Sequence, residues 1–186
     1  MTTIDDVVRR PQRADARRNF DALISAARTV FSAEGANASL EEIARDAGVG
    51  IGTLYRNFPT REALLEAVYV EEVQDLGRAA EAVAGLEPWD AFETWLHRFL
   101  EYLRTKRALV EGMNKQSEVM AVCRAAMYDA GGPLLARAQA AGVARDDISI
   151  EDAVRMIAGV SAVAYSDDAQ RDRVLGVAID ALRARS

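Results

Sequence analysis

Apolar residues recur along this chain at the spacing of one helical face, and glycine or proline interrupts each run. In residues 16–34, Phe20, Leu23 and Ile24 begin such a stripe at i, i+3 and i+4, and Gly35 directly follows it. This spacing predicts an amphipathic α-helix, and the glycine favours a left-handed helix end. Comparable stripes continue towards the C-terminus, so we predict an all-α fold.

A short second helix is predicted over 40–47, where the apolar positions again keep to one face. Ser39, directly before it, is a good N-cap, and Glu42 three residues later predicts a capping box. Gly48 after the helix fits the left-handed position that ends many helices. The chain is therefore expected to turn sharply at this point.

A third helix is predicted over 51–58, opened by Gly50 as its N-cap and ended by Pro59. Only Leu54 and Phe58 share its inward face. Its outer face carries polar side chains of the types that reach phosphates and base edges in a DNA major groove. These are Thr53, Tyr55, Arg56 and Asn57. The pattern predicts a helix-turn-helix, and the alternative is a solvated corner between two helices of an ordinary helical protein.

The run AGVGIGTLYRNFPTREALLEAV (47–68) resembles the helix-turn-helix of the tetracycline-repressor (TetR) family, whose pattern is roughly A-G-V-S-x-G-T-L-Y-x-Y-F-x-x-K-E-x-L. The residues that match this pattern directly are Gly48, Val49, Gly52, Thr53, Leu54, Tyr55, Phe58, Glu62 and Leu64. The resemblance implies that Thr53 contacts a phosphate or a base edge. It also implies that Tyr55 and the basic Arg61 each hold a phosphate.

Three positions depart from the family pattern: Gly50 stands for Ser or Thr, Asn57 for an aromatic residue, and Arg61 for Lys. None of these changes threatens the fold. They leave the operator sequence open, because Arg56 and Asn57 can both read base edges.

The net charge of the 186-residue chain is −6, but the charge is unevenly distributed. Residues 1–61 hold nine Arg against eight Asp and Glu, whereas residues 62–186 hold fourteen basic and twenty-one acidic residues. The acidity lies in the C-terminal two thirds, so a small basic footprint near the N-terminus can still bind DNA.

Residues 1–16 have no helical periodicity and are predicted to form a flexible basic arm. Arg17 and Arg18 at its end could contact phosphates or the minor groove, and the alternative is a solvated tail diluted by acidic residues. The residues that we expect at the DNA are Arg17, Arg18, Ser39, Gly52, Thr53, Tyr55, Arg56, Asn57 and Arg61.

We predict three segments: the arm over 1–16, a helix-turn-helix DNA-binding domain over 17–61, and a helical regulatory and dimerisation domain over 62–186. A long helix over 60–84, with Thr60 as its N-cap, links the last two. The family resemblance implies that this helix transmits motion between them.

The helices predicted for the body cover 88–106, 114–130, 133–141, 150–165 and 167–184. Gly131-Gly132-Pro133 is predicted to be the clearest break in the body. Ser149 and Asp152 are predicted to cap the helix that begins at residue 150.

The segment MIAGVSAVAY (156–165) is apolar around its whole circumference, and the last predicted helix covers more than one apolar stripe. Such helices should be buried on two sides, one of them against a second copy of the chain. The resemblance implies the four-helix dimer interface of the TetR family, and the alternative is a thick monomer core. The expected interface residues are Ala158, Gly159, Ala162, Val163, Val174, Val177, Ala178 and Ala181.

Large, adaptable side chains from several predicted helices of the body are suited to line a mostly apolar ligand cavity. They are Trp95, Phe99, Tyr102, Met113, Gln116, Met120, Met127, Tyr128 and Met156. Aromatic and methionine residues at helical spacing also build ordinary cores, so the ligand cannot be identified from them.

Other chemistry is not indicated by the sequence. The only histidine, His97, lies between Glu93 and Glu101 on a polar helix face, which indicates a surface charge cluster instead of a metal site. The only cysteine, Cys123, fits packing on an apolar face and a reducing compartment. We expect no cofactor, catalytic activity, secretion signal or membrane span, and a cytoplasmic location.

The sequence thus predicts a ligand-responsive transcriptional regulator that binds double-stranded DNA as a homodimer. The most direct interpretation is a repressor on a palindromic operator, released by a small-molecule inducer. The alternatives are an activator of the same family, or a small-molecule-binding helical protein with a vestigial DNA-binding head.

Overall fold

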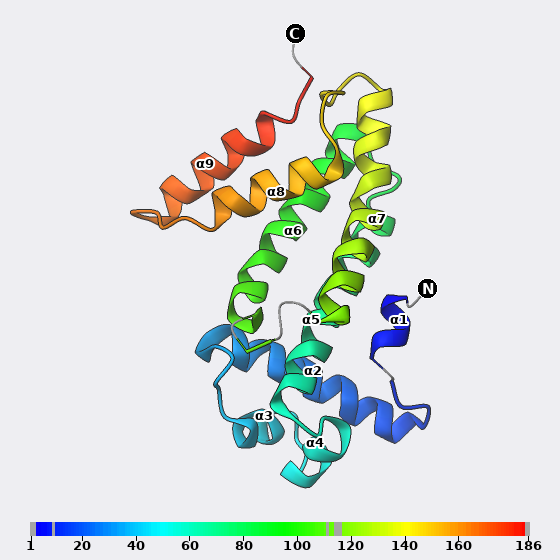
Figure 1. Cartoon of the computed structure of the whole chain (residues 1–186), viewed down its shortest axis with the longest axis vertical. Coiled ribbons are helices and arrows are strands. Elements are labelled where there is room, and N and C mark those ends of the chain that lie inside the picture. Colours follow the sequence, from blue (N-terminus) through cyan, green and yellow to red (C-terminus); the bar gives the residue numbers. More distant parts are fainter. Residues whose placement is uncertain (1–2, 9, 111, 114–116, 185–186) are drawn as a thin grey trace. The chain divides into compact units, whose positions relative to one another are not determined.

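The computed structural model describes residues 3–8, 10–110, 112–113 and 117–184 (Figure 1). Its elements in chain order are the helices α1 (Ile4–Val7), α2 (Ala14–Glu34), α3 (Leu40–Asp46), α4 (Ile51–Asn57), α5 (Arg61–Ala82), α6 (Pro88–Val110), α7 (Glu118–Ala140), α8 (Ile150–Ser161) and α9 (Asp168–Asp180). The described residues form no β-strand, although Ala144 and Arg183 make an isolated bridge. The predicted all-α fold is confirmed.

The chain divides into two compact units. The first comprises residues 1–74 and 104–124, and the second comprises residues 75–103 and 125–186. The first unit therefore contains α1 to α4 and the second contains α8 and α9, while α5, α6 and α7 each contribute residues to both. In the described ranges, no helix combines the length and the apolar character needed to cross a membrane.

The core of the first unit is built on one face of α2, where the predicted apolar stripe is buried. The ring of Phe20 packs against that of Phe58, with ring centroids 5.0 Å apart. α2 ends at Gly35, whose φ of 83° is readily adopted only by glycine. α2 begins at Ala14, two residues before its predicted start, and the stretch expected to be an arm contains α1.

A charged side chain of α5 lies within this core. Glu72 is only 2% exposed, and its Oε1 lies 2.6 Å from Nε of Arg28 on α2. The two atoms form an ion pair without the alignment of a hydrogen bond. Next to it, Glu71 pairs with Arg10, which also pairs with Asp21. Ion pairs thus join α5 to α2 and to the segment before α2.

The second unit is organised around α6, which buries a row of aromatic side chains as its stripe predicted. They are Trp89, Phe92, Trp95, Phe99 and Tyr102, and the centroids of neighbouring rings are 5.7–6.4 Å apart. The Trp95 indole N–H donates to the Leu76 carbonyl at 3.2 Å, so the polar atom of this buried ring is satisfied.

α7 runs without interruption through residues 131–133, so the predicted break at this point is wrong. The turn after the proline buries Leu134 and Leu135, and this packing outweighs the backbone hydrogen bond that the proline removes. Gly131 faces the Trp95 ring so closely that a β-carbon there would collide with it. The glycine therefore permits a close approach and does not end the helix.

α8 and α9 lie side by side (Figure 1). The predicted cap of α8 is confirmed as a capping box, in which Ser149 Oγ accepts from the Asp152 N–H and Asp152 Oδ2 accepts from the Ser149 N–H. α8 ends at Ser161, four residues before its predicted end. The chain folds back there, and the Tyr165 hydroxyl donates to the Val160 carbonyl at 2.7 Å.

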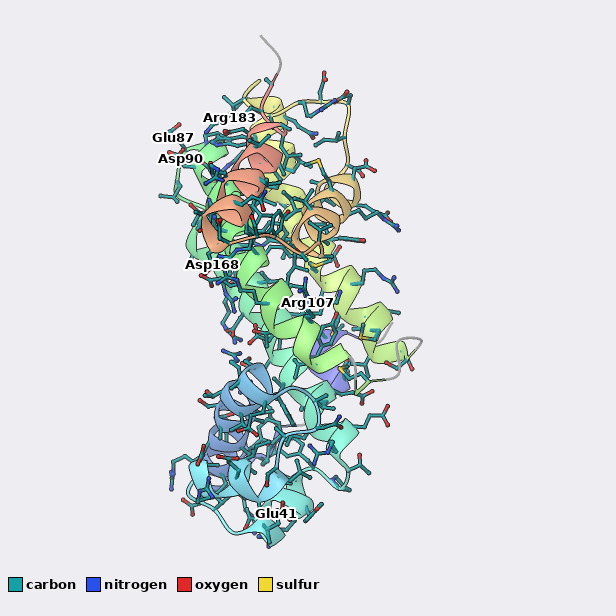
Figure 2. The ribbon with its side chains drawn as sticks, turned by 90° about the vertical axis from the view of Figure 1, so that its left-hand side faces the viewer. Glu41, Glu87, Asp90, Arg107, Asp168 and Arg183 are labelled. Atoms are coloured by element: carbon teal, nitrogen blue, oxygen red, sulfur yellow. The ribbon has the colours of Figure 1, made fainter. Side chains whose placement is uncertain are left out.

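The segment after α9 is fixed to the start of α6. The guanidinium carbon of Arg183, labelled in Figure 2, lies 4.2 Å from the centroid of the Trp89 ring in a cation–π contact. The Trp89 indole N–H donates to Glu93 at 2.8 Å. The Ala184 N–H donates to the carbonyl of Val143 in the α7–α8 connection. These contacts hold α9 within the second unit.

Candidate nucleic-acid interface

The turn between α3 and α4 is closed by a glycine, as predicted. Gly48 has a φ of 68° and its N–H donates to the Arg45 carbonyl, while the Val49 N–H donates to the Ala44 carbonyl, both at 3.0 Å. This pair of hydrogen bonds is a Schellman motif, which satisfies the last carbonyls of α3. It also directs the chain into α4, which starts directly after Gly50.

The N-cap of α3 is Ser39, whose Oγ accepts the Glu42 N–H at 3.2 Å. The predicted capping box is not formed, because the Glu42 carboxylate accepts from Arg45 instead. The Ser39 hydroxyl donates to the carboxylate of Glu41, labelled in Figure 2, at 3.2 Å. An expected phosphate contact from Ser39 would therefore compete with an acceptor on the protein itself.

α4 has one buried face and one open face. Leu54 and Phe58 are buried, as predicted. On the open face Tyr55 is 46% exposed and Arg56 is exposed, while Thr53 is half-buried. The buried face anchors α4 to the core of the first unit, so the open face is presented to solvent on a fixed backbone.

Two side chains of α4 are ordered by Thr53. Nη2 of Arg56 donates to Thr53 Oγ1 at 3.1 Å, and Nδ2 of the half-buried Asn57 donates to the Thr53 carbonyl at 2.8 Å. The Asn57 amide nitrogen is thus engaged with the backbone of α4. Arg56 is held by a neutral hydroxyl, and among the described residues it forms no ion pair. Its remaining donors suit a bidentate contact to guanine O6 and N7.

Arg61, the predicted phosphate ligand at the start of α5, is half-buried and holds the connection that leads into α3. Its Nη1 donates to the carbonyl oxygens of Ala36 and Ala38. Part of this guanidinium therefore serves the fold, and a phosphate contact would have to use its other donors.

Arg17 and Arg18 are exposed on α2. Nε of Arg17 donates to the Pro11 carbonyl at 3.3 Å, and Arg18 pairs with Asp15. An exposed ion pair such as that of Arg18 with Asp15 is weak and exchanges easily for a phosphate. Gly52 is also exposed, and apart from its chain neighbours and the backbone of α4, no atom lies within 4 Å of the position that a β-carbon on it would occupy. The DNA contacts of these residues stay predictions.

The structure exposes an apolar residue that the sequence pattern did not single out. Ile51, the first residue of α4, is 37% exposed. The inward face predicted from the sequence holds only Leu54 and Phe58, and Ile51 is given no role, although its i, i+3 and i+7 spacing with these two residues is compatible with the core. The available signal was the glycine on either side of it, which leaves this isoleucine without bulky sequence neighbours.

The predicted ligand-pocket residues are distributed over both units. Those that are buried are Trp95, Phe99, Tyr102, Met113 and Met127, and those that are half-buried are Met120, Tyr128 and Met156. Gln116 lies outside the described residues. Stacking joins Trp95, Phe99 and Tyr102 into one row on α6. A pocket formed by all of these residues stays a prediction.

Most of the predicted dimer residues lie at the surface of α8 and α9 or directly after these helices. Those that are exposed are Gly159, Ala162, Val163, Val174, Val177 and Ala181, and Ala158 is half-buried. Val177 is 69% exposed, which is unusual for a valine on a helix. Ala178 is buried in the core of its own chain, so it cannot belong to this surface. We call the six exposed residues the α8–α9 surface.

Two further side chains with reactive or metal-binding atoms are Cys123 and His97. Cys123 is buried, and burial raises the pKa of its thiol to about 12. His97 is exposed on α6. Within the described part of the chain, no three His, Cys, Asp or Glu side chains are grouped in a way that could hold a metal ion.

A glycine-closed turn between two short helices, with the second anchored by its apolar face and open on its polar face, defines a helix-turn-helix DNA-binding protein. The family model "Bacterial regulatory proteins, tetR family" matches residues 23–68. The model "Transcriptional regulator SbtR-like, C-terminal domain" matches residues 87–184. The chain therefore belongs to the TetR family of transcriptional regulators, with an N-terminal DNA-binding domain and a C-terminal ligand-binding domain.

Solved structures resemble the chain along most of its length. The TetR transcriptional regulator SCO0520 from Streptomyces coelicolor is 40% identical, and the match covers 89% of this chain and 99% of that chain with a TM-score of 0.74. The TetR transcription regulatory protein from Mycobacterium vanbaalenii is 32% identical, with 94% and 100% covered and a TM-score of 0.72. RolR, solved with resorcinol, shares the fold at 21% identity, with 93% and 92% covered and a TM-score of 0.58.

Proposed function

We propose that this protein is a repressor that binds a palindromic DNA operator as a homodimer and leaves it when a small molecule binds the C-terminal domain. The observation that carries the DNA-binding part is the open face of α4. Tyr55 and Arg56 project from this face, and Thr53 orders Arg56 before DNA is bound. A guanidinium that is already oriented loses less conformational entropy on binding.

The proposed contacts divide by chemistry. Arg56 reads a guanine, and the Tyr55 hydroxyl donates to a phosphate. Thr53 contacts the DNA or acts through Arg56, while the carbonyl oxygen of Asn57 remains an acceptor for a base amino group. The residues that complete the proposed phosphate contacts are Arg17, Arg18, Ser39 and Arg61, and Gly52 lets the backbone approach closely.

The α8–α9 surface supports the homodimer. Val174 and Val177 on α9 and Val163 directly after α8 expose apolar area that a second copy of the same surface would bury. A two-fold dimer carries two DNA-binding domains. It would therefore recognise two half-sites that run in opposite directions and are separated by one turn of the DNA helix or a multiple of it. The palindromic operator follows from that symmetry.

Release by a small molecule requires that the molecule bind more tightly to a form of the dimer whose DNA-binding domains do not fit both half-sites than to the form that does. The buried aromatic row of α6 is the proposed apolar part of that binding site. We place this activity in the cytoplasm, with the chromosome, and propose no catalytic role. An activator would use the same contacts, and the position of the operator relative to the promoter would distinguish it from a repressor.

The decisive experiment measures fluorescence anisotropy of the protein on an operator selected from genomic fragments, with unrelated DNA as competitor. Arg56→Ala should lower operator affinity by about 10- to 100-fold, the range of one lost bidentate base contact, while affinity for unrelated DNA changes far less. Arg155→Ala is the matched control, because it removes the same charge from an exposed ion pair on α8. Equal binding of wild-type protein to selected and unrelated DNA would contradict the proposal.

The ligand-dependent part is tested separately by screening small molecules for an increase in melting temperature. A true inducer should raise the melting temperature and, at the same concentration, dissociate the operator complex. Both effects follow from its binding to the folded form that does not fit the operator. A compound that stabilises the protein but leaves operator affinity unchanged is not an inducer. If no stabilising compound affects the DNA complex, the protein regulates transcription without this release step.

A further inference from the structure

Ile51 is an exposed apolar side chain on α4, a helix whose open face otherwise carries polar side chains. It is the first residue of α4, and more than a third of its surface is exposed. Gly50 and Gly52 flank it, and no atom beyond their chain neighbours and the backbone of α4 lies within 4 Å of a β-carbon position on either glycine. Because both neighbours in sequence are glycines, neither has a side chain that would limit how closely a ligand can approach Ile51.

Tyr55 lies one turn further along the same helix, at i+4, and is exposed as well. Residues at i and i+4 point to the same side of a helix. Ile51 is three residues before the buried Leu54 and four before the exposed Tyr55, so it lies where the buried face of α4 meets the side that carries Tyr55. Tyr55 is proposed to hold a phosphate. A surface that meets DNA at Tyr55 brings Ile51 to the DNA too.

The chemistry of isoleucine restricts what it can recognise there. Its side chain neither donates nor accepts a hydrogen bond, so it gains nothing from a phosphate or from a polar base edge, and it would desolvate either one at a cost. In the major groove the apolar group that distinguishes one base from the others is the C5 methyl of thymine. An exposed aliphatic side chain on the groove-facing side of a recognition helix fits that methyl group.

We propose that Ile51 is a specificity-determining residue that reads a thymine in each operator half-site by packing on its C5 methyl group. This inference rests on the proposed function and deepens it, because it assigns a base to a residue that carries no polar group. Arg56 and Ile51 would then supply two different kinds of readout from one helix, a guanine by hydrogen bonds and a thymine by apolar contact.

The test removes the methyl group from the DNA and the side chain from the protein, separately and together. In the selected operator, each thymine is replaced by deoxyuridine, one symmetric pair of positions at a time. Affinities are measured for wild-type protein and for Ile51→Ala. Val143→Ala, which shortens a 37% exposed valine in the α7–α8 connection, is the matched control.

Wild-type protein should lose about fourfold in affinity per half-site at one particular thymine, the value of one buried methyl group. Ile51→Ala should bind the thymine operator more weakly, and the same deoxyuridine substitution should then cost it nothing further. The Val143→Ala variant should respond as the wild type does. Circular dichroism should show Ile51→Ala folded, because Ile51 is not part of the core.

Two outcomes would overturn the inference, and they are distinguishable from failure of the proposed function. If wild-type protein selects its operator but every deoxyuridine substitution affects it and Ile51→Ala equally, Ile51 reads no thymine. If Ile51→Ala leaves operator affinity unchanged, the side chain does not touch DNA. Failure of wild-type protein to prefer any selected sequence would overturn the proposed function and this inference with it.

Discussion

Gly131 on α7 faces the indole of Trp95 on α6 so closely that a β-carbon on the glycine would stand 2.7 Å from Cζ3 and 2.8 Å from Cζ2 of the ring. Both partners belong to the second unit, and the ring is fully buried. A rigid aromatic ring in a packed core cannot withdraw as a flexible side chain could. The absence of a side chain at residue 131 is therefore a packing requirement.

We expect Gly131→Ala to destabilise the protein by about 1–3 kcal/mol, the usual effect of overpacking a core. Gly132→Ala is the control, because the nearest atom to its β-carbon position is Ile150 Cγ2 at an ordinary 3.8 Å. That variant should be neutral or stabilise by up to about 1 kcal/mol, since alanine favours a helix more than glycine does. Urea unfolding measures both, and equal stability of the two variants would contradict the packing account.

The ion pair between Arg28 and Glu72 gives a second stability prediction. Arg28→Met leaves a carboxylate that is 2% exposed without this cation, and should destabilise the protein by about 1–3 kcal/mol. The expected value lies below that for a fully buried pair because the Arg28 side chain is about one third exposed. The double variant Arg28→Met/Glu72→Met should be more stable than Arg28→Met alone. A double variant that is less stable than both single variants would show that the pair does not act as described.

The buried thiol of Cys123 makes stability depend on alkaline pH. Its pKa of about 12 lies above the value of about 8.5 in an unfolded chain. Between these values the folded protein keeps the proton that the unfolded chain loses, so stability must fall as pH rises, by at most about 1.4 kcal/mol per pH unit. The unfolding free energy of wild type should therefore drop more between about pH 8 and about pH 10 than that of Cys123→Ala.

Alkylation of the same thiol provides an independent measurement. Native protein should react with iodoacetamide far more slowly than unfolded protein at the same pH, because the thiolate is the reactive form. Labelling of the native protein at the rate of the unfolded chain would show that Cys123 is accessible and ionised, and would remove the basis of the pH prediction.

The hydrogen bond from Arg56 to Thr53 predicts coupling between the two residues in operator binding. Thr53→Val removes the hydroxyl at nearly constant volume, and Thr53→Ser keeps it. If Thr53 acts by positioning Arg56, Thr53→Val should weaken operator binding in the wild type but have little effect in an Arg56→Ala background. Thr53→Ser should bind nearly as the wild type does. Additive losses would show that Thr53 contacts the DNA directly.

Disruption of the α8–α9 surface should affect DNA binding at a distance. Val177→Asp places a charge on the most exposed valine of that surface and should yield monomers by sedimentation or light scattering. Operator affinity should then fall by about 100-fold or more, since the two heads no longer bind as a linked pair. Val143→Asp, on another exposed valine, should remain a dimer. A dimeric Val177→Asp variant would place the interface elsewhere.

Local signals predicted most of the helices well because local chemistry decides them. Gly48 has the positive φ that its place after α3 implied, and Ser149 is the expected N-cap of α8, with Asp152 in its first turn. The prediction from sequence was wrong where packing between distant residues overrides the local preference for a helix end. From the local sequence Gly131 predicts the end of a helix. In the structure it lies inside α7, where it packs against the Trp95 ring.

The candidate site shows a similar limit at the level of side chains. Residue types identified Thr53, Tyr55 and Arg56 as the open face of α4, and the structure places them there. They could not show that Arg61 donates to the carbonyls before α3, because those atoms lie more than twenty residues away in sequence. The sequence pattern also assigned no role to Ile51, because an apolar residue at this spacing is compatible with the core and only the structure shows that it is exposed.

The two faces of α4 separate the residues that keep this helix in place from those proposed to choose its DNA sequence. Leu54 and Phe58 are buried, so substitutions there would lower the stability of the fold. Ile51 and Arg56 lie outside the core. Substitutions at the outer positions can therefore accumulate in evolution with little penalty in stability. After a gene duplication, one copy could acquire a new set of target promoters through one or two such changes and keep its inherited dimer and its inherited signal.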